Sequence, residues 1–304
     1  MCGFTGFFLN SISQKKDLLD QVILMSDAIE HRGPDDSGAW VDEGIGLAMG
    51  HRRLAIVDIS KAGHQPMHSH SSRFIIAFNG EIYNHKELRA QLELLSQDLI
   101  WRGSSDTETL LAAFEYWGVE NTLDRLVGMF AISLWDKIEK KLYLIRDRFG
   151  EKPLYFGWVN TPNDSVFAFG SELKSFRAYK GFSNKVSRVA LKEYFRFMYV
   201  PAPYSIYEDI FKLEAGCMLI IDGIPPKTAS DYPPHPFEGI EFVHSNIIVK
   251  KWYSVKDKIS SKVSKSFESK RAAYDALEKQ LQETIQMQSE ADVPLGAFLS
   301  GGVD

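Results

Sequence analysis

The second residue of the chain, Cys2, is the first side chain with an evident chemical use. A residue this small at position 2 permits removal of the initiator methionine, which leaves a thiol and a free α-amine on one residue. An α-amine has a pKa of about 7.7–8.0, so part of it is free base at pH 7 and can take the thiol proton. Position alone also fits an ordinary small residue that leads into a strand. The first candidate activity is nucleophilic catalysis by an N-terminal cysteine.

A second candidate lies at the end of the sequence, where the apolar segment Val293 to Leu299 runs into a glycine-containing turn. The turn consists of Ser300, Gly301, Gly302, Val303 and Asp304. Backbone N–H groups and a hydroxyl in such a turn can hold phosphate oxygens. The turn lacks the glycine and lysine spacing of a Walker-type loop. It therefore indicates a phosphate site of another kind.

Two further features are interpreted as structural. His64, His68 and His70 lie in a polar segment without adjacent acidic residues, which is a poor cage for a metal ion. Cys217 begins the apolar run Cys-Met-Leu-Ile-Ile, where a thiol is usually a small core residue. We therefore predict no metal site from these residues.

Several polar motifs recur between the apolar runs of the chain. The early ones are His31 to Asp35, His51 to Asp58 and Asn79 to Asn84. The later ones are Arg146 to Tyr155, Ser171 to Lys174, Tyr199 to Pro203 and Ile210 to Gly216. Together with Cys2-Gly3, this ordered set resembles the class II glutamine amidotransferase domain, in the branch found in glutamine-hydrolysing asparagine synthetases. The resemblance covers essentially the whole chain.

The resemblance implies a site that hydrolyses the amide of glutamine. Cys2 then supplies the nucleophile and, through its α-amine, the base. The Asn79 amide and the Gly80 N–H match the donors to the oxyanion, and each such donor is worth about 3–4 kcal/mol. Glycine lets the backbone come close to the substrate. Taken alone, Asn79-Gly80 is also a common type I′ turn pair.

The remaining implied roles concern the charged ends of glutamine. Arg53 matches the residue that binds the carboxylate through two nitrogens, which lysine would not replace. The same glutamine-binding stretch continues through Leu54, Ala55, Ile56 and Val57. Glu81 and Asp106 match the acidic groups that face the ammonium. Taken alone, Arg53 also fits a solvated arginine, and Asp106 fits a carboxylate favoured by a helix N-terminus.

The turn at the end of the sequence resembles the pyrophosphate loop of ATP pyrophosphatases, which cleave ATP to AMP and pyrophosphate. The positions carried over as a partial ATP site are Leu299, Ser300, Gly301, Gly302 and Asp304. The family pattern continues with a serine, a helix and an aspartate-binding part that this sequence does not contain. We therefore expect the chain to be cut within the loop, with a complete nucleotide site only in a longer protein.

Apolar runs bounded by turn residues predict strands throughout the first 222 residues. The expected strands are residues 4–9, 45–58, 74–82, 130–135, 141–145, 154–159 and 166–169. Helical spacing predicts helices that begin near Leu18 and Leu88, and a third with a capping box at Ser105 and Glu108 that stops at Gly118. Adjacent strands with few helices between them favour an α+β fold. The resemblance specifies the four-layer αββα sandwich of N-terminal-nucleophile amidohydrolases.

After residue 222 the composition changes. Five prolines between positions 225 and 236 predict a linker or long loop. A helix follows from Glu268 to Gln288 with an apolar stripe that we expect to face a core, and then a strand from Val293 to Leu299. We expect a glutaminase domain at residues 2–222, an irregular linker at 223–267, and the first helix and strand of an α/β synthetase domain at 268–304.

Charge and composition exclude several classes of protein. Lys and Arg number 35 against 40 Asp and Glu, and this net charge of −5 without a basic block argues against a nucleic-acid surface. No apolar run approaches the roughly 18 residues that span a bilayer, and no secretory signal is present. Two cysteines give no disulfide framework. These features predict a cytoplasmic protein with no nucleic-acid or membrane partner.

The resemblance implies that the full enzyme transfers ammonia from glutamine to aspartate, which ATP and Mg²⁺ activate, to make asparagine, AMP and pyrophosphate. The glutaminase part needs no cofactor. A related enzyme that amidates another carboxylate, such as a sugar uronate or a peptide, stays open. A transferase of the glucosamine-phosphate synthase or phosphoribosylamine type fits the C-terminal turn less well, and an inactive fragment is a further alternative. The oligomeric state is also open, a homodimer included.

Overall fold

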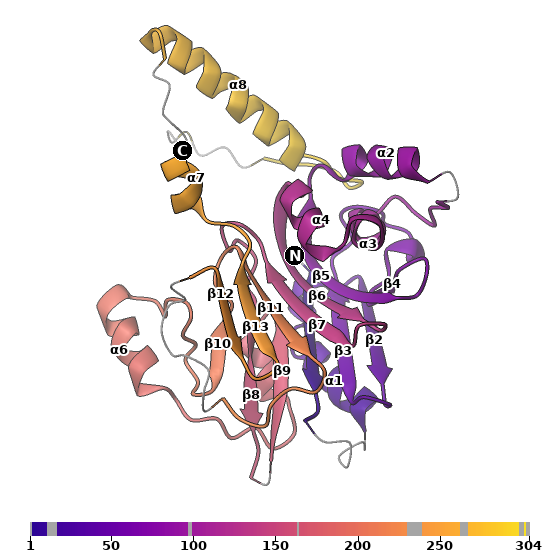
Figure 1. Ribbon diagram of the computed structural model, residues 1–304, viewed down its shortest axis with the longest axis vertical. Helices are drawn as coiled ribbons and strands as arrows, with labels where there is room; N and C mark the ends of the chain where they lie inside the picture. Colours follow the sequence, from indigo (N-terminus) through magenta and orange to yellow (C-terminus); the bar gives the residue numbers. More distant parts are fainter. Residues whose placement is uncertain are drawn as a thin grey trace.

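The computed structural model describes residues 2–10, 17–96, 99–162, 164–229, 239–261, 267–297 and 301. Within them, two antiparallel β-sheets face each other, and helices cover the outer face of each (Figure 1). The first sheet has the order β10 (Ile210–Lys212), β8 (Tyr155–Asn160), β9 (Ser165–Gly170), β1 (Gly3–Phe8), β3 (Leu47–Arg53) and β2 (Asp36–Asp42). The α+β prediction is confirmed.

The second sheet lies against the first. Its order is β12 (Glu241–His244), β13 (Ile247–Lys251), β11 (Cys217–Asp222), β7 (Lys141–Arg146), β6 (Gly128–Asp136), β5 (Phe74–Ile82) and β4 (Met67–His68). The helices are α1 (Leu18–Asp27), α2 (His85–Leu95), α3 (Asp106–Trp117), α4 (Val119–Arg125), α5 (Leu173–Arg177), α6 (Arg188–Phe197), α7 (Val255–Ser261) and α8 (Lys270–Gln288).

Alternating side chains hold the layers together. In β1, Phe4 and Phe8 enter the core between the sheets, whereas Phe7 packs in the core beneath α1 and α5. In β5, Ile75 enters the core between the sheets, and Ile76 packs on the opposite face with α3 and α4. Because both faces of these strands are covered, they are apolar at nearly every position. The result is the four-layer αββα sandwich that the sequence predicted.

Helix α3 begins and ends where the sequence predicted. The Ser105 hydroxyl accepts a hydrogen bond from the Glu108 N–H at 3.2 Å, and Gly118 caps the other end with a φ of 76°. Only half of the predicted capping box forms, because the Glu108 carboxylate accepts from the backbone N–H groups of Arg102 and Gly103 instead. The loop before α3 is thereby tied to the helix, which fixes Asp106 as its first residue.

Strand β3 is shorter than the predicted strand at residues 45–58. It ends at Arg53 because its partners end there: Gly3 of β1 pairs with Arg52, and Asp36 of β2 pairs with Arg53. Residues 54–60 form a loop instead. Strand β2 was not predicted: it is an edge strand whose sequence DSGAWVD has only the short apolar stretch Ala-Trp-Val and is only partly buried.

The second sheet continues beyond residue 222. Strands β12 and β13 form a hairpin, and β13 pairs with β11 so that Val249 lies opposite Leu219. The expected irregular segment at 223–267 is therefore wrong for residues 241–251, where Ile247 and Val249 enter the core between the sheets. Residues 230–238, which hold three of the prolines, lie outside the described residues.

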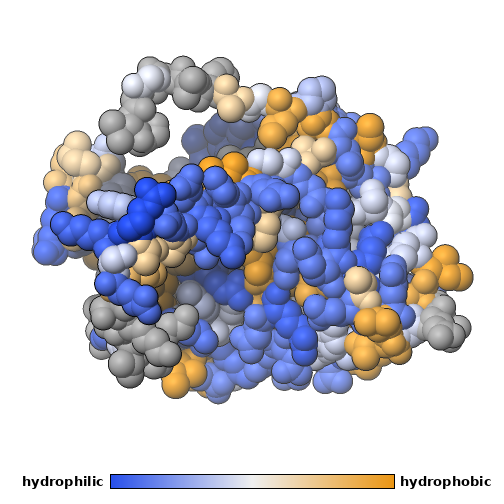
Figure 2. Space-filling view, turned by 90° about the horizontal axis from the view of Figure 1, so that it is seen from above, coloured by the Kyte–Doolittle hydropathy of each residue, from blue (hydrophilic) through white to orange (hydrophobic). Residues whose placement is uncertain are grey.

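Helix α8 forms close to its predicted position, with the Ser269 hydroxyl as its N-cap. Its apolar stripe does not face a core: Tyr274, Leu277, Leu281 and Ile285 are 52–66% exposed. The view from above shows a mostly hydrophilic surface with scattered hydrophobic groups (Figure 2). The predicted strand at 293–299 is not formed over residues 293–297, since no strand in the described part of the chain pairs with them, and 298–299 lie outside it.

Candidate active site

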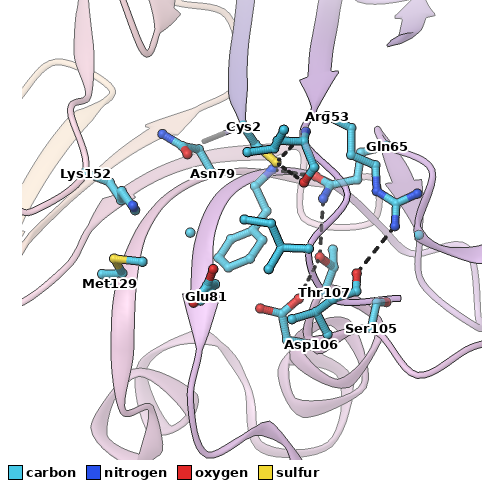
Figure 3. Close-up of a pocket in the computed structure, with 16 residues that line it drawn as sticks. Cys2, Arg53, Gln65, Asn79, Glu81, Ser105, Asp106, Thr107, Met129 and Lys152 are labelled. Atoms are coloured by element: carbon cyan, nitrogen blue, oxygen red, sulfur yellow. Dashed lines mark hydrogen bonds between the residues drawn. The ribbon is translucent and has the colours of Figure 1, made fainter. Parts of the chain in front are cut away.

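A pocket opens where β1 begins, β3 ends and β5 approaches the N-terminus of α3. Figure 3 shows the side chains that line it. They are Cys2, Arg53, Leu54, Ile56, Val57, Gly63, Gln65, Phe78, Asn79, Gly80, Glu81, Ser105, Asp106, Thr107, Met129 and Lys152. The predicted glutaminase residues thus meet in one place, with the exception of Ala55, which does not line the pocket.

Cys2 is held at the pocket wall by its neighbours. Its Sγ accepts a hydrogen bond from the Leu54 N–H at 3.3 Å and lies 3.5 Å from the Leu54 carbonyl oxygen. The Arg32 guanidinium donates to the Cys2 carbonyl at 2.9 Å and to the Glu172 carboxylate at 2.8 Å. Burial raises the pKa of the Cys2 thiol, although the Leu54 hydrogen bond opposes the shift. A thiol in this environment needs a proton acceptor before it can act as a nucleophile.

Asn79 and Gly80 lie within β5, paired with Ala131 and Phe130 of β6. The interpretation of Asn79-Gly80 as a turn is therefore wrong. The Asn79 side chain is 1% exposed, and its Nδ2 finds no hydrogen-bond partner among the described residues. Buried amide donors are almost always paired, so this one is available for a ligand. Asn79 and Cys2 line the same pocket (Figure 3).

Gly80 allows β5 and β6 to approach each other at the pocket. A Cβ atom at this position would lie 2.2 Å from the Met129 carbonyl oxygen. Any other residue would push the strands apart, so glycine is required here by packing as well as by access to a substrate.

Arg53 is 6% exposed, so the alternative of a solvated arginine is wrong. Its guanidinium donates to the Ser60 carbonyl at 2.9 Å and also to the Asp58 and Val57 carbonyls. Gly63 makes room for it, because a Cβ there would lie 1.9 Å from Arg53 Nη2. An arginine carries five N–H donors, so one that is held by a loop can still bind a carboxylate.

Glu81 and Asp106 place two acidic groups at the pocket wall that faces Cys2 (Figure 3). Burial raises the pKa of Glu81, the nearby Asp106 charge adds to the shift, and Lys152 opposes it. Burial also raises the pKa of Asp106, whose carboxylate accepts from the Ile82 N–H at 3.0 Å. Two adjacent carboxyl groups suit a cationic ligand, because its charge would favour their ionised forms.

Several pocket residues carried no role in the sequence analysis. Lys152 is 4% exposed and reaches the pocket beside Glu81, and burial lowers the pKa of its ammonium while Glu81 opposes the shift. Lysines are rarely buried unless they are paired with an opposite charge. The sequence signal that could have identified Lys152 is its place in the polar motif from Arg146 to Tyr155. Gln65 joins β5 to α3, accepting from the Phe78 N–H at 2.7 Å and donating to the Thr107 hydroxyl at 3.3 Å. Nothing in the sequence near Gln65 indicated this.

The other predicted sites stand apart from this pocket. Leu299, Ser300, Gly302 and Asp304 of the partial ATP site lie outside the described residues, and Gly301 is exposed with a φ of 76°. Cys217 is a buried core residue, as predicted, and burial raises its pKa to about 12. In the described ranges, no group of three His, Cys, Asp or Glu residues is arranged to hold a metal ion, and no helix could span a membrane.

Comparison with known proteins agrees with this geometry. A sequence profile of the glutamine amidotransferase domain matches residues 1–229, and a profile of asparagine synthase matches residues 276–304. All of the chain aligns at 34% identity with asparagine synthetase [glutamine-hydrolyzing] 1 of Bacillus subtilis, of which it covers 42%. It aligns at 34% with a putative asparagine synthetase of Methanocaldococcus jannaschii, covering 55%, and at 27% with amidase chry2 of Gibberella zeae, covering 41%. The chain thus spans about half the length of these relatives.

A solved structure with the same fold is the glutamine phosphoribosylpyrophosphate amidotransferase of B. subtilis. It aligns over 73% of this chain and 47% of its own, with a TM-score of 0.51 and 20% identity. At that identity the likeness concerns the fold, which is the N-terminal-nucleophile amidotransferase sandwich. The profile match over residues 1–229 goes further, and the chain belongs to the glutamine amidotransferase domain family.

Proposed function

We propose that this chain hydrolyses glutamine to glutamate and ammonia through a thioester on Cys2. The observation that carries the proposal is the buried Nδ2 of Asn79, which has no hydrogen-bond partner among the described residues and belongs to the pocket that Cys2 also lines. A donor at that place matches the oxyanion of a tetrahedral intermediate formed on the cysteine.

The roles of the pocket residues follow from the charges of glutamine. With the initiator methionine removed, the Cys2 α-amine takes the thiol proton, and the sulfur attacks the amide carbon. The Asn79 amide and the Gly80 N–H bind the oxyanion, and the proton passes to the departing ammonia. Water then cleaves the thioester to release glutamate. Arg53 binds the carboxylate of the substrate, and the adjoining stretch Leu54 to Val57 also contacts the substrate. Glu81 and Asp106 bind its ammonium.

For the longer protein we propose an asparagine synthetase. Ammonia from the glutaminase domain at residues 2–222 would amidate aspartate activated by ATP with Mg²⁺, in the cytoplasm. The names of the relatives and the asparagine synthase match at residues 276–304 support this reaction. The partial ATP site at residues 299–304 would belong to it. The start of the synthetase part at residue 268, and an assembly such as a homodimer, stay predictions, whereas residues 241–251 belong to the second sheet rather than to a linker.

A second candidate is an enzyme of the same kind with a different carboxylate acceptor. The alignment with an amidase named chry2 over the whole chain favours keeping it. Both candidates share the glutaminase step, so the test below addresses both, and the acceptor is decided by assaying aspartate against sugar uronates and peptides in the full-length protein.

The test is glutamate release from glutamine by the wild-type chain and by Cys2→Ala. We expect Cys2→Ala to abolish both hydrolysis and covalent labelling by a diazo-ketone analogue of glutamine, and Cys217→Ala, its matched control, to retain both. Asn79→Ala should lower kcat by about 10²–10³-fold with little change in KM, because its amide meets charge only in the intermediate. Hydrolysis that survives in Cys2→Ala, or a wild-type chain as inactive as that variant, would refute the proposal.

A further inference from the structure

The segment after α8 returns to the sandwich and contacts the loop that borders the active-site pocket. Asp292 makes two hydrogen bonds there: its N–H donates to the Ile56 carbonyl at 2.9 Å, and its carboxylate accepts from the Asp58 N–H at 2.7 Å. Glu290 pairs with Lys86 and lies 3.4 Å from His85 at the start of α2. Figure 1 shows the chain passing from the end of α8 to the side of α2.

The contacted loop is the one that holds Arg53. Within residues 54–60, the carbonyls of Val57, Asp58 and Ser60 accept from the Arg53 guanidinium. Asp58 therefore carries a contact on each side of its backbone: its carbonyl oxygen faces Arg53, and its N–H faces Asp292. A change in the orientation of the Asp58 backbone would disturb both hydrogen bonds, the one with Arg53 and the one with Asp292.

The backbone of Asp58 needs such support. Its φ is 55°, in the left-handed region that residues other than glycine rarely adopt. Its carboxylate accepts from the N–H groups of Ser60 and Ser104 at 3.0 and 2.8 Å. These bonds fix the side chain of Asp58, whereas the N–H of the same residue is fixed by Asp292. Without that acceptor, the peptide group before Asp58 is free to rotate away from the geometry that places the loop carbonyls on Arg53.

We propose that Asp292 is a positioning residue for glutamine binding, which acts through the Asp58 backbone on the Arg53 guanidinium. The inference rests on the proposed glutaminase function and adds to it a residue 234 positions away in sequence from the loop that it holds. Asp292 does not line the pocket and lies in the stretch that matches the asparagine synthase profile. Asp292 therefore connects that stretch to Arg53, the residue proposed to bind the carboxylate of glutamine.

The expected signature is a change in substrate affinity without a change in chemistry. Asp292→Ala should raise KM for glutamine about tenfold and leave kcat within about twofold, because the Arg53 contact is made equally in the ground state and the transition state. Asp292→Asn keeps an acceptor for the Asp58 N–H and should restore KM to within about threefold of wild type. Asp275→Ala removes an exposed carboxylate of α8 that pairs only with Arg271 in the described structure, and should change neither constant.

The experiment combines glutaminase kinetics with hydrogen exchange of the loop. Exchange at residues 56–60 should quicken in Asp292→Ala and not in Asp275→Ala, while β5 stays unchanged. If KM and loop exchange in Asp292→Ala equal those of wild type, the inference is wrong and the glutaminase proposal is untouched. If the loop loosens and KM does not change, Asp292 only fastens the tail, which also overturns the inference. If wild type fails to hydrolyse glutamine, the glutaminase proposal fails first and the role in glutamine binding fails with it.

Discussion

At the scale of single residues, burial in the pocket disfavours the charged forms of its ionisable side chains. Burial raises the pKa values of Cys2 and Glu81 and lowers that of Lys152. Each group is thus closer to its neutral form than it would be in water, and a zwitterionic ligand would reverse this by supplying the opposite charges. The proposed substrate glutamine carries both charges, and the pocket offers Arg53 to its carboxylate and Glu81 to its ammonium.

This balance predicts how activity depends on pH. Glu81 must be ionised to bind an ammonium, and its pKa is raised, so kcat/KM for glutamine should fall as pH drops through that raised pKa. The Lys152 charge lowers the pKa of Glu81, so Lys152→Met should raise it further and shift the acid limb to higher pH. Rate profiles from about pH 5 to about pH 8 test this. Lys180→Met, at an exposed position, is the control, and a limb that stays in place or moves to lower pH contradicts the prediction.

The family resemblance indicated the reactive groups better than the supporting ones. Cys2, Asn79 and Asp106 belong to motifs that the sequence displays, and they meet in the pocket, although residue type alone also fitted structural roles for all three. Gln65 joins two elements through backbone and hydroxyl contacts that only the folded chain creates. The contact of Asp292 is harder still to predict, because its partner is a backbone N–H, and the sequence does not distinguish one backbone N–H from another.

At the scale of elements, β5 and β6 approach so closely at Gly80 that an added side chain should lower the free energy of unfolding. Gly80→Ala places a methyl group 2.2 Å from the Met129 carbonyl oxygen, which must move with its strand. Overpacking of this kind costs about 1–3 kcal/mol, so the free energy of unfolding should fall by that amount and glutaminase activity with it. Denaturant unfolding measures the change.

The matched control is Gly296→Ala, where an added Cβ meets nothing within 4 Å. It should leave the unfolding midpoint unchanged. Equal midpoints for Gly80→Ala, Gly296→Ala and wild type would mean that β6 yields without cost, and the packing argument for Gly80 would then be wrong.

Element bounds were predictable where burial covers both faces of a strand. The limits of β5 agree with the prediction because its apolar run stops where its pairing with β6 stops. The predicted strand at 45–58 was too long because apolar Leu54, Ile56 and Val57 line the pocket rather than a sheet. Edge strand β2 was missed because half-buried positions leave no strong pattern. At pocket walls and sheet edges, therefore, the hydrophobic pattern of the sequence does not predict the limits of the strands.

At the scale of the whole molecule, stability should divide after the β12–β13 hairpin. Strand β13 is paired on both sides, by β11 and β12, and its backbone amides should exchange as slowly as those of β11. No residue of the 19-residue helix α8 is buried, and an unsupported helix of that length is marginal in water, so its amides should exchange quickly. Hydrogen exchange followed by mass spectrometry compares the two. Slow exchange along α8 would contradict the prediction and point to a partner for its apolar stripe.

The contact between Asp292 and the loop of Asp58 also has a thermodynamic consequence, because binding equilibria that share a contact are reciprocal. If docking of the segment after α8 tightens glutamine binding by some factor, glutamine must tighten that docking by the same factor. The substrate is then an effector of the polypeptide that follows α8. Occupancy of the glutamine pocket would be communicated through the Asp58 backbone to the stretch that matches asparagine synthase.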